Sequence, residues 1–211
     1  MKMNLPALKV GENSRFLVNQ NGEPFFWLGD TAWELIHKLS LAETQLYFQN
    51  RIEKGFTIIQ TVILAELDGL TVPNANGDLP LKDLDPSQPN EAYFSHVDKI
   101  IELANEMGLY LALLPTWGDK FNKKWGTGPE VFTPENARAF GASLAKRYAK
   151  HQHIVWVLGG DRVPQDKEDE AIIEQMAMGI REFDKDSLIT YHPNGGVIAS
   201  DIFGKSTWLQ V

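Results

Sequence analysis

The sequence contains no cysteine among its 211 residues. This absence excludes disulfide bonds, a thiolate nucleophile and cysteine-ligated metal sites, and it leaves the redox compartment open. Basic residues are also in the minority, because 20 Lys and Arg stand against 28 Asp and Glu, which gives a net charge of −8. Such a chain is a poor partner for nucleic-acid phosphates and is not attracted to anionic membranes. We therefore expect no nucleic-acid partner and no membrane partner.

Long apolar runs and two well-known binding motifs are missing as well. No stretch of about 18 apolar residues occurs, so the sequence predicts no transmembrane helix. Residues 1–16 lack the continuous apolar core of a secretory signal, which as written predicts a soluble, cytoplasmic chain. No Gly-x-Gly-x-x-Gly follows a predicted strand and no Gly-x-Ser-x-Gly occurs, so the chain lacks the signs of a dinucleotide site and of a serine hydrolase. We expect no cofactor.

Apolar β-branched segments alternate with segments of helical periodicity, which predicts βαβ units and a parallel sheet. A hairpin is expected first, at residues 15–18 and 24–28, with its second strand running on into 29–33. Strands then follow at 56–64, 109–114, 154–159 and 188–192, with helices at 40–54, 91–107, 133–150 and 167–183, and residues 206–211 predict the start of a sixth strand. Residues 65–90 form a long connection, and long loops are often functional. Without repeats or linkers, residues 1–211 are expected to form one α/β domain.

The candidate site residues are those that follow the predicted strands, because parallel sheets and barrels bind ligands at the carboxyl ends of their strands. In chain order they are Asp30 and Trp33, Glu66 and Asp68, Thr116, Trp117 and Asp119, Asp161 and Arg162, and His192 and Asn194. Indole faces stack on the C–H faces of sugar rings, and carboxylates bind hydroxyls or exchange protons with a glycosidic oxygen. The set therefore predicts a carbohydrate ligand.

Each candidate also has a purely structural interpretation. Asp30 and Asp161 follow glycine, where aspartate is a common turn residue or helix cap, although two such positions at equivalent strand ends weaken this reading. Tryptophans are more often core residues, and Asp68 fits the solvated start of a loop. His151 and His153 have a spacing that could chelate a metal ion, but they precede the strand at 154–159. We interpret both as surface residues at the opposite end of the sheet and expect no metal site.

Four ordered motifs resemble one protein family. They are Trp27-Leu28-Gly29-Asp30-Thr31-Ala32-Trp33, Leu114-Pro115-Thr116-Trp117-Gly118-Asp119, Trp156-Val157-Leu158-Gly159-Gly160-Asp161 and Tyr191-His192-Pro193. Together they are similar to the apiosidase-like glycoside hydrolases, a bacterial (β/α)8-barrel family that includes enzymes acting on pectin side chains. The resemblance implies a TIM-barrel fold and hydrolysis of a glycosidic bond in plant or microbial polysaccharide. It also implies that Asp161 is the proton donor, where the broader clan of barrel glycosidases usually has Asn-Glu.

The other site residues take their expected roles from this interpretation. Asp30, Glu66, Asp119, His192 and Asn194 bind substrate hydroxyls, Arg162 orients or charge-balances Asp161, and Trp33 and Trp117 stack on the sugar. The second catalytic carboxylate is expected beyond residue 211, because the chain supplies only the first five or six barrel strands. We therefore expect a longer chain to provide the remaining strands. Family members are often periplasmic or secreted, so the compartment stays open.

Two other functions remain possible at this stage. The first is a non-catalytic carbohydrate-binding barrel fragment built from the same residues, which sugar binding without release of reducing ends would favour. The second is another barrel chemistry, such as that of a metal-dependent isomerase or amidohydrolase. The lack of a well-placed histidine pair disfavours the second function.

Overall fold

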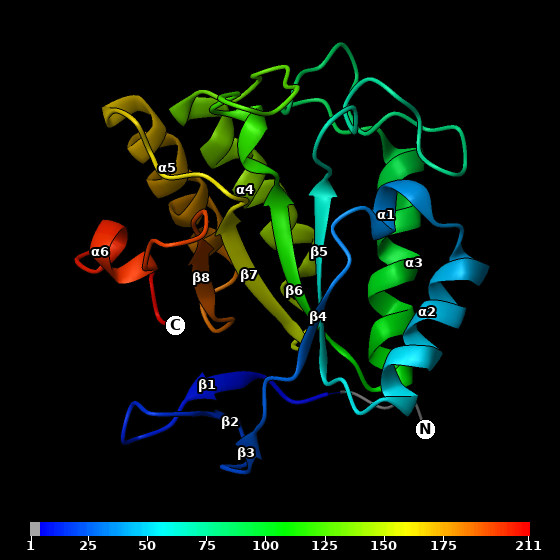
Figure 1. The fold of residues 1–211 in the computed structure, drawn as a ribbon, viewed down its shortest axis with the longest axis vertical. Helices are drawn as coiled ribbons and strands as arrows, with labels where there is room; N and C mark the ends of the chain where they lie inside the picture. Colours follow the sequence, from blue (N-terminus) through cyan, green and yellow to red (C-terminus); the bar gives the residue numbers. More distant parts are fainter. Residues whose placement is uncertain (1–4) are drawn as a thin grey trace.

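The computed structural model describes residues 5–211, and its larger sheet has five parallel strands (Figure 1). These strands are β4 (Gly29–Thr31), β5 (Ile58–Leu64), β6 (Tyr110–Thr116), β7 (Ile154–Gly159) and β8 (Ile189–His192). Their order in the sheet is the order in the chain, and each strand pairs in parallel with the next. This is the arrangement of the first strands of a (β/α)8 barrel, which confirms the predicted fold class.

Helices connect the strands and cover the outer face of the sheet. They are α1 (Leu35–Lys38), α2 (Leu41–Glu53), α3 (Glu91–Met107), α4 (Pro134–Tyr148), α5 (Lys167–Phe183) and α6 (Ala199–Phe203), with a 3-10 turn η1 (Gly118–Lys120) after β6. In Figure 1 the arrowheads of β5 and β6 point to the top, where the loops to α3 and α4 lie. No helix in residues 5–211 is long and apolar enough to cross a membrane.

The ends of the long helices follow from local sequence. Ser40 and Glu43 form a capping box at the start of α2, and Thr133 caps α4 in the same way with Pro134 in its first turn. Gly108 ends α3 in the left-handed conformation, at φ 82°. These local signals explain why the predicted helices are confirmed to within a few residues.

Alternate residues of the strands enter two separate apolar cores. Ile59 and Ile63 of β5 pack against the helices, whereas Ile58 and Val62 face the barrel interior. A small antiparallel sheet packs on the interior cluster, at the end opposite to the strand carboxyl ends. It consists of β1 (Leu8–Val10), β2 (Leu17–Asn19) and β3 (Pro24–Phe25). The predicted hairpin is therefore confirmed as β2 and β3, although β1 was not expected and the chain leaves the sheet before β4.

Two expectations are wrong, one about the end of the chain and one about His153. Residues 206–211 form no strand, and Gln210 makes one backbone hydrogen bond of 3.1 Å to Ile189 of β8. Trp208 is instead buried against Phe203 of α6, a helix too short for its periodicity to be recognised. His153 is buried rather than on the surface, because its Nε2 lies 3.0 Å from the Ile101 carbonyl oxygen.

Candidate active site

The end of β7 turns sharply because three successive residues are left-handed. The φ angles of Gly159, Gly160 and Asp161 are 103°, 82° and 55°. A Cβ atom on Gly159 would lie 2.5 Å from the His192 carbonyl oxygen, and one on Gly160 would lie 2.7 Å from the Gly118 nitrogen. Only glycine fits these two positions, whereas aspartate tolerates the third. The sequence Gly-Gly-Asp thus ends a buried strand abruptly and places a carboxylate at its carboxyl end.

Asp161 and His192 form the centre of the site. Nε2 of His192 lies 3.0 Å from Oδ1 of Asp161, and the two side chains are 32% and 45% exposed, respectively. The His192 ring lies 5.3 Å from the ring of Trp33, which in turn lies 5.0 Å from that of Trp117. The structure therefore brings together four predicted residues from the ends of β4, β6, β7 and β8, with an accessible carboxyl group beside aromatic rings.

Glu66 is a further carboxyl group at this end of the sheet, directly after β5. Burial raises the pKa of Glu66, and the negative charges of Glu34, Asp119 and Asp161 raise it further. Glu66 therefore keeps its proton to a higher pH than an exposed glutamate. A protonated carboxyl can donate a hydrogen bond to a ligand oxygen as well as accept one.

Glu34 belongs to the same group of acids and was not predicted. Its Oε2 atom lies 3.2 Å from Nδ1 of His37, and this hydrogen bond raises the pKa of His37. Its Oε1 atom is buried without a hydrogen-bond partner among residues 5–211. Glu34 directly follows the Trp33 motif, and that position at a strand end was the signal that could have identified it.

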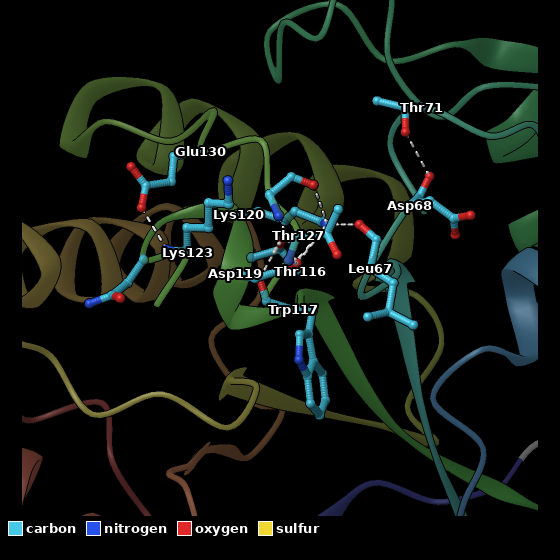
Figure 2. Close-up of polar contacts among 12 residues, drawn as sticks. Leu67, Asp68, Thr71, Thr116, Trp117, Asp119, Lys120, Lys123, Thr127 and Glu130 are labelled. Atoms are coloured by element: carbon cyan, nitrogen blue, oxygen red, sulfur yellow. Dashed lines mark hydrogen bonds and ion pairs between the residues drawn. The ribbon is translucent and has the colours of Figure 1, made fainter. Parts of the chain in front are cut away.

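Asp119 and Lys120 form a buried ion pair that joins the loop after β5 to the loop between β6 and α4 (Figure 2). The side chains are 1% and 0% exposed. Nζ of Lys120 donates to Asp119 at 3.1 Å, to the Leu67 carbonyl at 2.8 Å and to the Gly128 carbonyl at 3.0 Å. Asp119 also accepts backbone hydrogen bonds of 3.1 Å from Thr127 and Gly128. The structure thus gives Asp119 a part in holding loops together, in place of the expected contact with a substrate hydroxyl.

Arg162 is wholly buried and holds backbone rather than substrate. Its guanidinium donates to the carbonyl oxygens of Asn122 at 2.6 Å, Asp161 at 2.9 Å and Lys123 at 3.0 Å. Burial lowers its pKa, against the opposing effect of nearby carboxylates. The expectation that Arg162 orients Asp161 therefore takes a specific form, because the contact is with the Asp161 main chain and not with its carboxylate.

Asp30 lies apart from the other predicted residues. Its register partner in β5 is Ile59, which faces the helices, and its Oδ2 atom accepts hydrogen bonds from Tyr47 at 2.8 Å and Arg51 at 2.6 Å. Burial opposes ionisation of Asp30, but these hydrogen bonds outweigh it and hold the pKa of Asp30 below its usual value. Asp30 thus joins β4 to α2 and does not face the site. Asn194 lies on the partly exposed loop after β8, and its amide donates to the Gly195 carbonyl.

A cavity of about 470 Å³ lies between the loop after β6 and the start of α5. Its lining includes Asn122, Lys124, Glu130, Gln165 and Asp166, none of which was predicted. Within residues 5–211, no group of three or more His, Asp or Glu side chains is placed to hold a metal ion.

The family model "Apiosidase-like, catalytic domain" matches residues 11–211. The chain belongs to this family. No curated protein matches this apiosidase-like chain. Among solved structures, a protein described as a glycoside hydrolase is 30% identical, with a TM-score of 0.83 over 97% of this chain and 44% of its own. A glycoside hydrolase family 5 protein from Bacteroides vulgatus is 28% identical, with a TM-score of 0.85 over 99% of this chain and 45% of its own.

The apiosidase-like chain shares its fold with more distant barrel enzymes. The catalytic domain of Thermobifida fusca endoglucanase Cel5A is 15% identical, with a TM-score of 0.54 over 98% of this chain and 58% of its own. The family model and the 30%-identical glycoside hydrolase confirm the resemblance drawn from the four strand-end motifs. The chain spans less than half the length of the two most similar of these structures.

Proposed function

We propose that this chain forms the proton-donating half of a glycosidase active site that acts on plant or microbial polysaccharide, such as pectin side chains. The observation that carries the proposal is the accessible Asp161 carboxyl, held 3.0 Å from His192 beside Trp33 and Trp117. A proton donor next to stacking rings is the arrangement that cleavage between two sugars needs. Membership of the apiosidase-like family supports the same reaction class.

In the proposed reaction, Asp161 transfers its proton to the glycosidic oxygen as the bond to the anomeric carbon breaks. His192 contacts one carboxyl oxygen and fixes the orientation of the group. A second carboxylate, expected beyond Val211, then attacks the anomeric carbon or activates a water molecule. A separation of roughly 5–5.5 Å between the two carboxyls corresponds to retention and roughly 6.5–9.5 Å to inversion. Glu66 and Asn194 bind hydroxyls, Trp33 stacks on the sugar, and the buried Trp117 packs against Trp33 and supports its ring.

The first test replaces Asp161 by Asn in the complete protein, including any segment that continues beyond Val211. Asp68→Asn is a matched control, because Asp68 also follows a strand and its side chain is likewise 45% exposed. We expect Asp161→Asn to lower kcat by roughly 10²–10⁴-fold on natural oligosaccharides, the usual size of a general-acid contribution. Aryl glycosides with acidic phenol leaving groups should lose much less activity, because these leaving groups depart without a proton.

Two results would contradict the assignment. Unchanged kcat on natural oligosaccharides in the Asp161→Asn protein excludes Asp161 as the acid. An equal loss on both substrate classes assigns Asp161 to substrate binding instead of proton transfer. If the wild-type protein binds oligosaccharides without releasing reducing ends, the chain is part of a carbohydrate-binding protein rather than of an enzyme.

A further inference from the structure

Trp125 lies exposed on the loop between β6 and α4. Its side chain is 59% exposed, whereas Trp117 at the end of β6 is 4% exposed and packs into the interior cluster. An exposed indole offers an apolar face on which the C–H face of a sugar ring can stack. Single exposed hydrophobic residues are common, so the support beneath Trp125 decides whether it can serve as a binding surface.

The loop that carries Trp125 is fixed from below by buried charged groups. The Arg162 guanidinium carbon lies 4.6 Å from the centre of the Trp125 ring, and Arg162 donates to the preceding backbone at Asn122 and Lys123. Asp119 and Lys120 hold the residues that follow the tryptophan, through Thr127 and Gly128 (Figure 2).

The space beneath the loop is also closed. A Cβ atom on Gly126 would lie 2.3 Å from the Asp119 Cβ and 2.8 Å from an Arg162 nitrogen, so the loop packs directly on these two residues. Burying Arg162, Lys120 and Asp119 costs free energy of desolvation, which their hydrogen bonds offset. All three groups hold one short loop whose largest exposed side chain is Trp125. Such fixed support is what a binding surface requires, because it removes the entropy cost of ordering the loop on binding.

We propose that Trp125 is a stacking platform for a sugar residue next to the one bound at Asp161. Arg162 connects the two positions directly, since it contacts the Trp125 ring and donates to the Asp161 carbonyl at 2.9 Å. The exposed Lys124, whose Nζ atom lies 4.6 Å from the ring centre, is flexible enough to move aside. Lys124 also lines the cavity of about 470 Å³, so the space beyond the platform can receive a longer saccharide.

This inference rests on the proposed function only in taking the ligand to be a saccharide. The test compares Trp125→Ala and Trp125→Phe in the complete protein, with Phe183→Ala as control. Phe183 is also an exposed aromatic residue, but it is the last residue of α5. The first residues of that helix, and not the last, follow Asp161 closely in the chain. The probes are an aryl monoglycoside and pectin-derived oligosaccharides of two to six residues. Binding is measured by calorimetry in the Asp161→Asn background, and hydrolysis in the wild-type background.

We expect Trp125→Ala to weaken oligosaccharide binding and kcat/KM by about tenfold, the size of one stacking contact. Trp125→Phe should restore most of this loss, and the aryl monoglycoside should be hydrolysed at the wild-type rate. Unchanged oligosaccharide binding in Trp125→Ala overturns the inference. An equal loss on the monoglycoside also overturns it, because the effect then lies at the cleaved sugar.

The outcome for the proposed function is read separately. If the wild-type protein hydrolyses nothing while Trp125→Ala still weakens oligosaccharide binding, the stacking role of Trp125 is supported and the assignment of Asp161 as the acid fails. If Asp161→Asn abolishes hydrolysis while Trp125→Ala behaves as the wild type, the reverse holds. Failure of the wild-type protein to bind or cleave any of these saccharides overturns both.

Discussion

At the residue scale, the decisive feature is the conformation of Gly159, Gly160 and Asp161. The left-handed turn is encoded locally, so the sequence predicted where Asp161 would lie. It could not predict that Asp119 and Arg162 are buried, although both also follow strands. Their burial depends on the loop at residues 121–132, which folds over them through contacts between different strand ends. Position after a strand therefore identifies the right end of the sheet, while exposure depends on neighbouring loops.

The need for glycine in this turn gives a prediction for Gly160→Ala. The new Cβ atom would lie 2.7 Å from the Gly118 nitrogen, and alanine is strained at a φ of 82°. We expect the free energy of unfolding to fall by about 1–3 kcal/mol. Gly195→Ala is the control, because a Cβ atom there has nothing within 4 Å. Urea denaturation of both variants measures the difference, and equal stabilities would show that the turn relaxes around the methyl group.

At the element scale, the boundaries of the long helices were predictable, because each cap or glycine stop involves only residues within a few positions of the helix end. The contact between β4 and α2 was not, because Asp30 is separated from Tyr47 and Arg51 by 17 and 21 residues. A carboxylate after glycine at a strand end has the same sequence pattern whether it faces the barrel mouth or the helices. The register of β4 with β5 decides this, and that register is a tertiary property.

This contact makes stability depend on pH in a defined direction. We expect Asp30→Asn to lower the free energy of unfolding by about 1–3 kcal/mol at pH 7, since a charged acceptor for Tyr47 and Arg51 is lost. The pKa of Asp30 in the folded protein lies below the ordinary value of 3.8. The stabilisation is therefore complete above pH 3.8 and is lost as the pH falls through the lower, folded-state pKa.

The measurement is urea denaturation of the wild-type protein and Asp30→Asn between pH 7 and pH 3. The difference between the two should shrink toward the acid end of this range. Asp83→Asn serves as the control, because Asp83 is exposed and lies in the loop at residues 65–90. A difference that stays constant with pH would show that the ionised form of Asp30 is not the one that stabilises β4 against α2.

At the scale of the whole molecule, five strands form one wall of a barrel, and the small sheet closes its lower end. The alternation of strands and helices predicted the wall. It did not predict the closure, because β1 has only three residues and its partners on the interior face come from β5 and β6, far along the chain. The same limit applies to the site, where residues of four strands meet and long-range contacts decide which side chains reach the substrate.

The closure depends on Tyr110, at the start of β6. Its ring lies 4.8 Å from the Phe25 ring in an edge-to-face contact, and its hydroxyl donates to the Pro6 carbonyl at 2.7 Å. We expect Tyr110→Ala to lower the free energy of unfolding by about 3–5 kcal/mol, the usual cost of removing a buried aromatic ring. Tyr110→Phe should lose only about 1 kcal/mol, because the ring stays and one hydrogen bond is removed.

Phe26→Ala, directly after β3, is the control, since Phe26 is 76% exposed and the loss of its side chain should be close to neutral. Urea denaturation compares all three variants with the wild type. If Tyr110→Ala and Phe26→Ala are equally stable, the small sheet contributes nothing to the folded wall. The expected order, with Tyr110→Ala far below the others, means that the barrel interior needs this cover at its lower end. The strand ends that carry Asp161 and His192 then rest on a core that is closed from the opposite side.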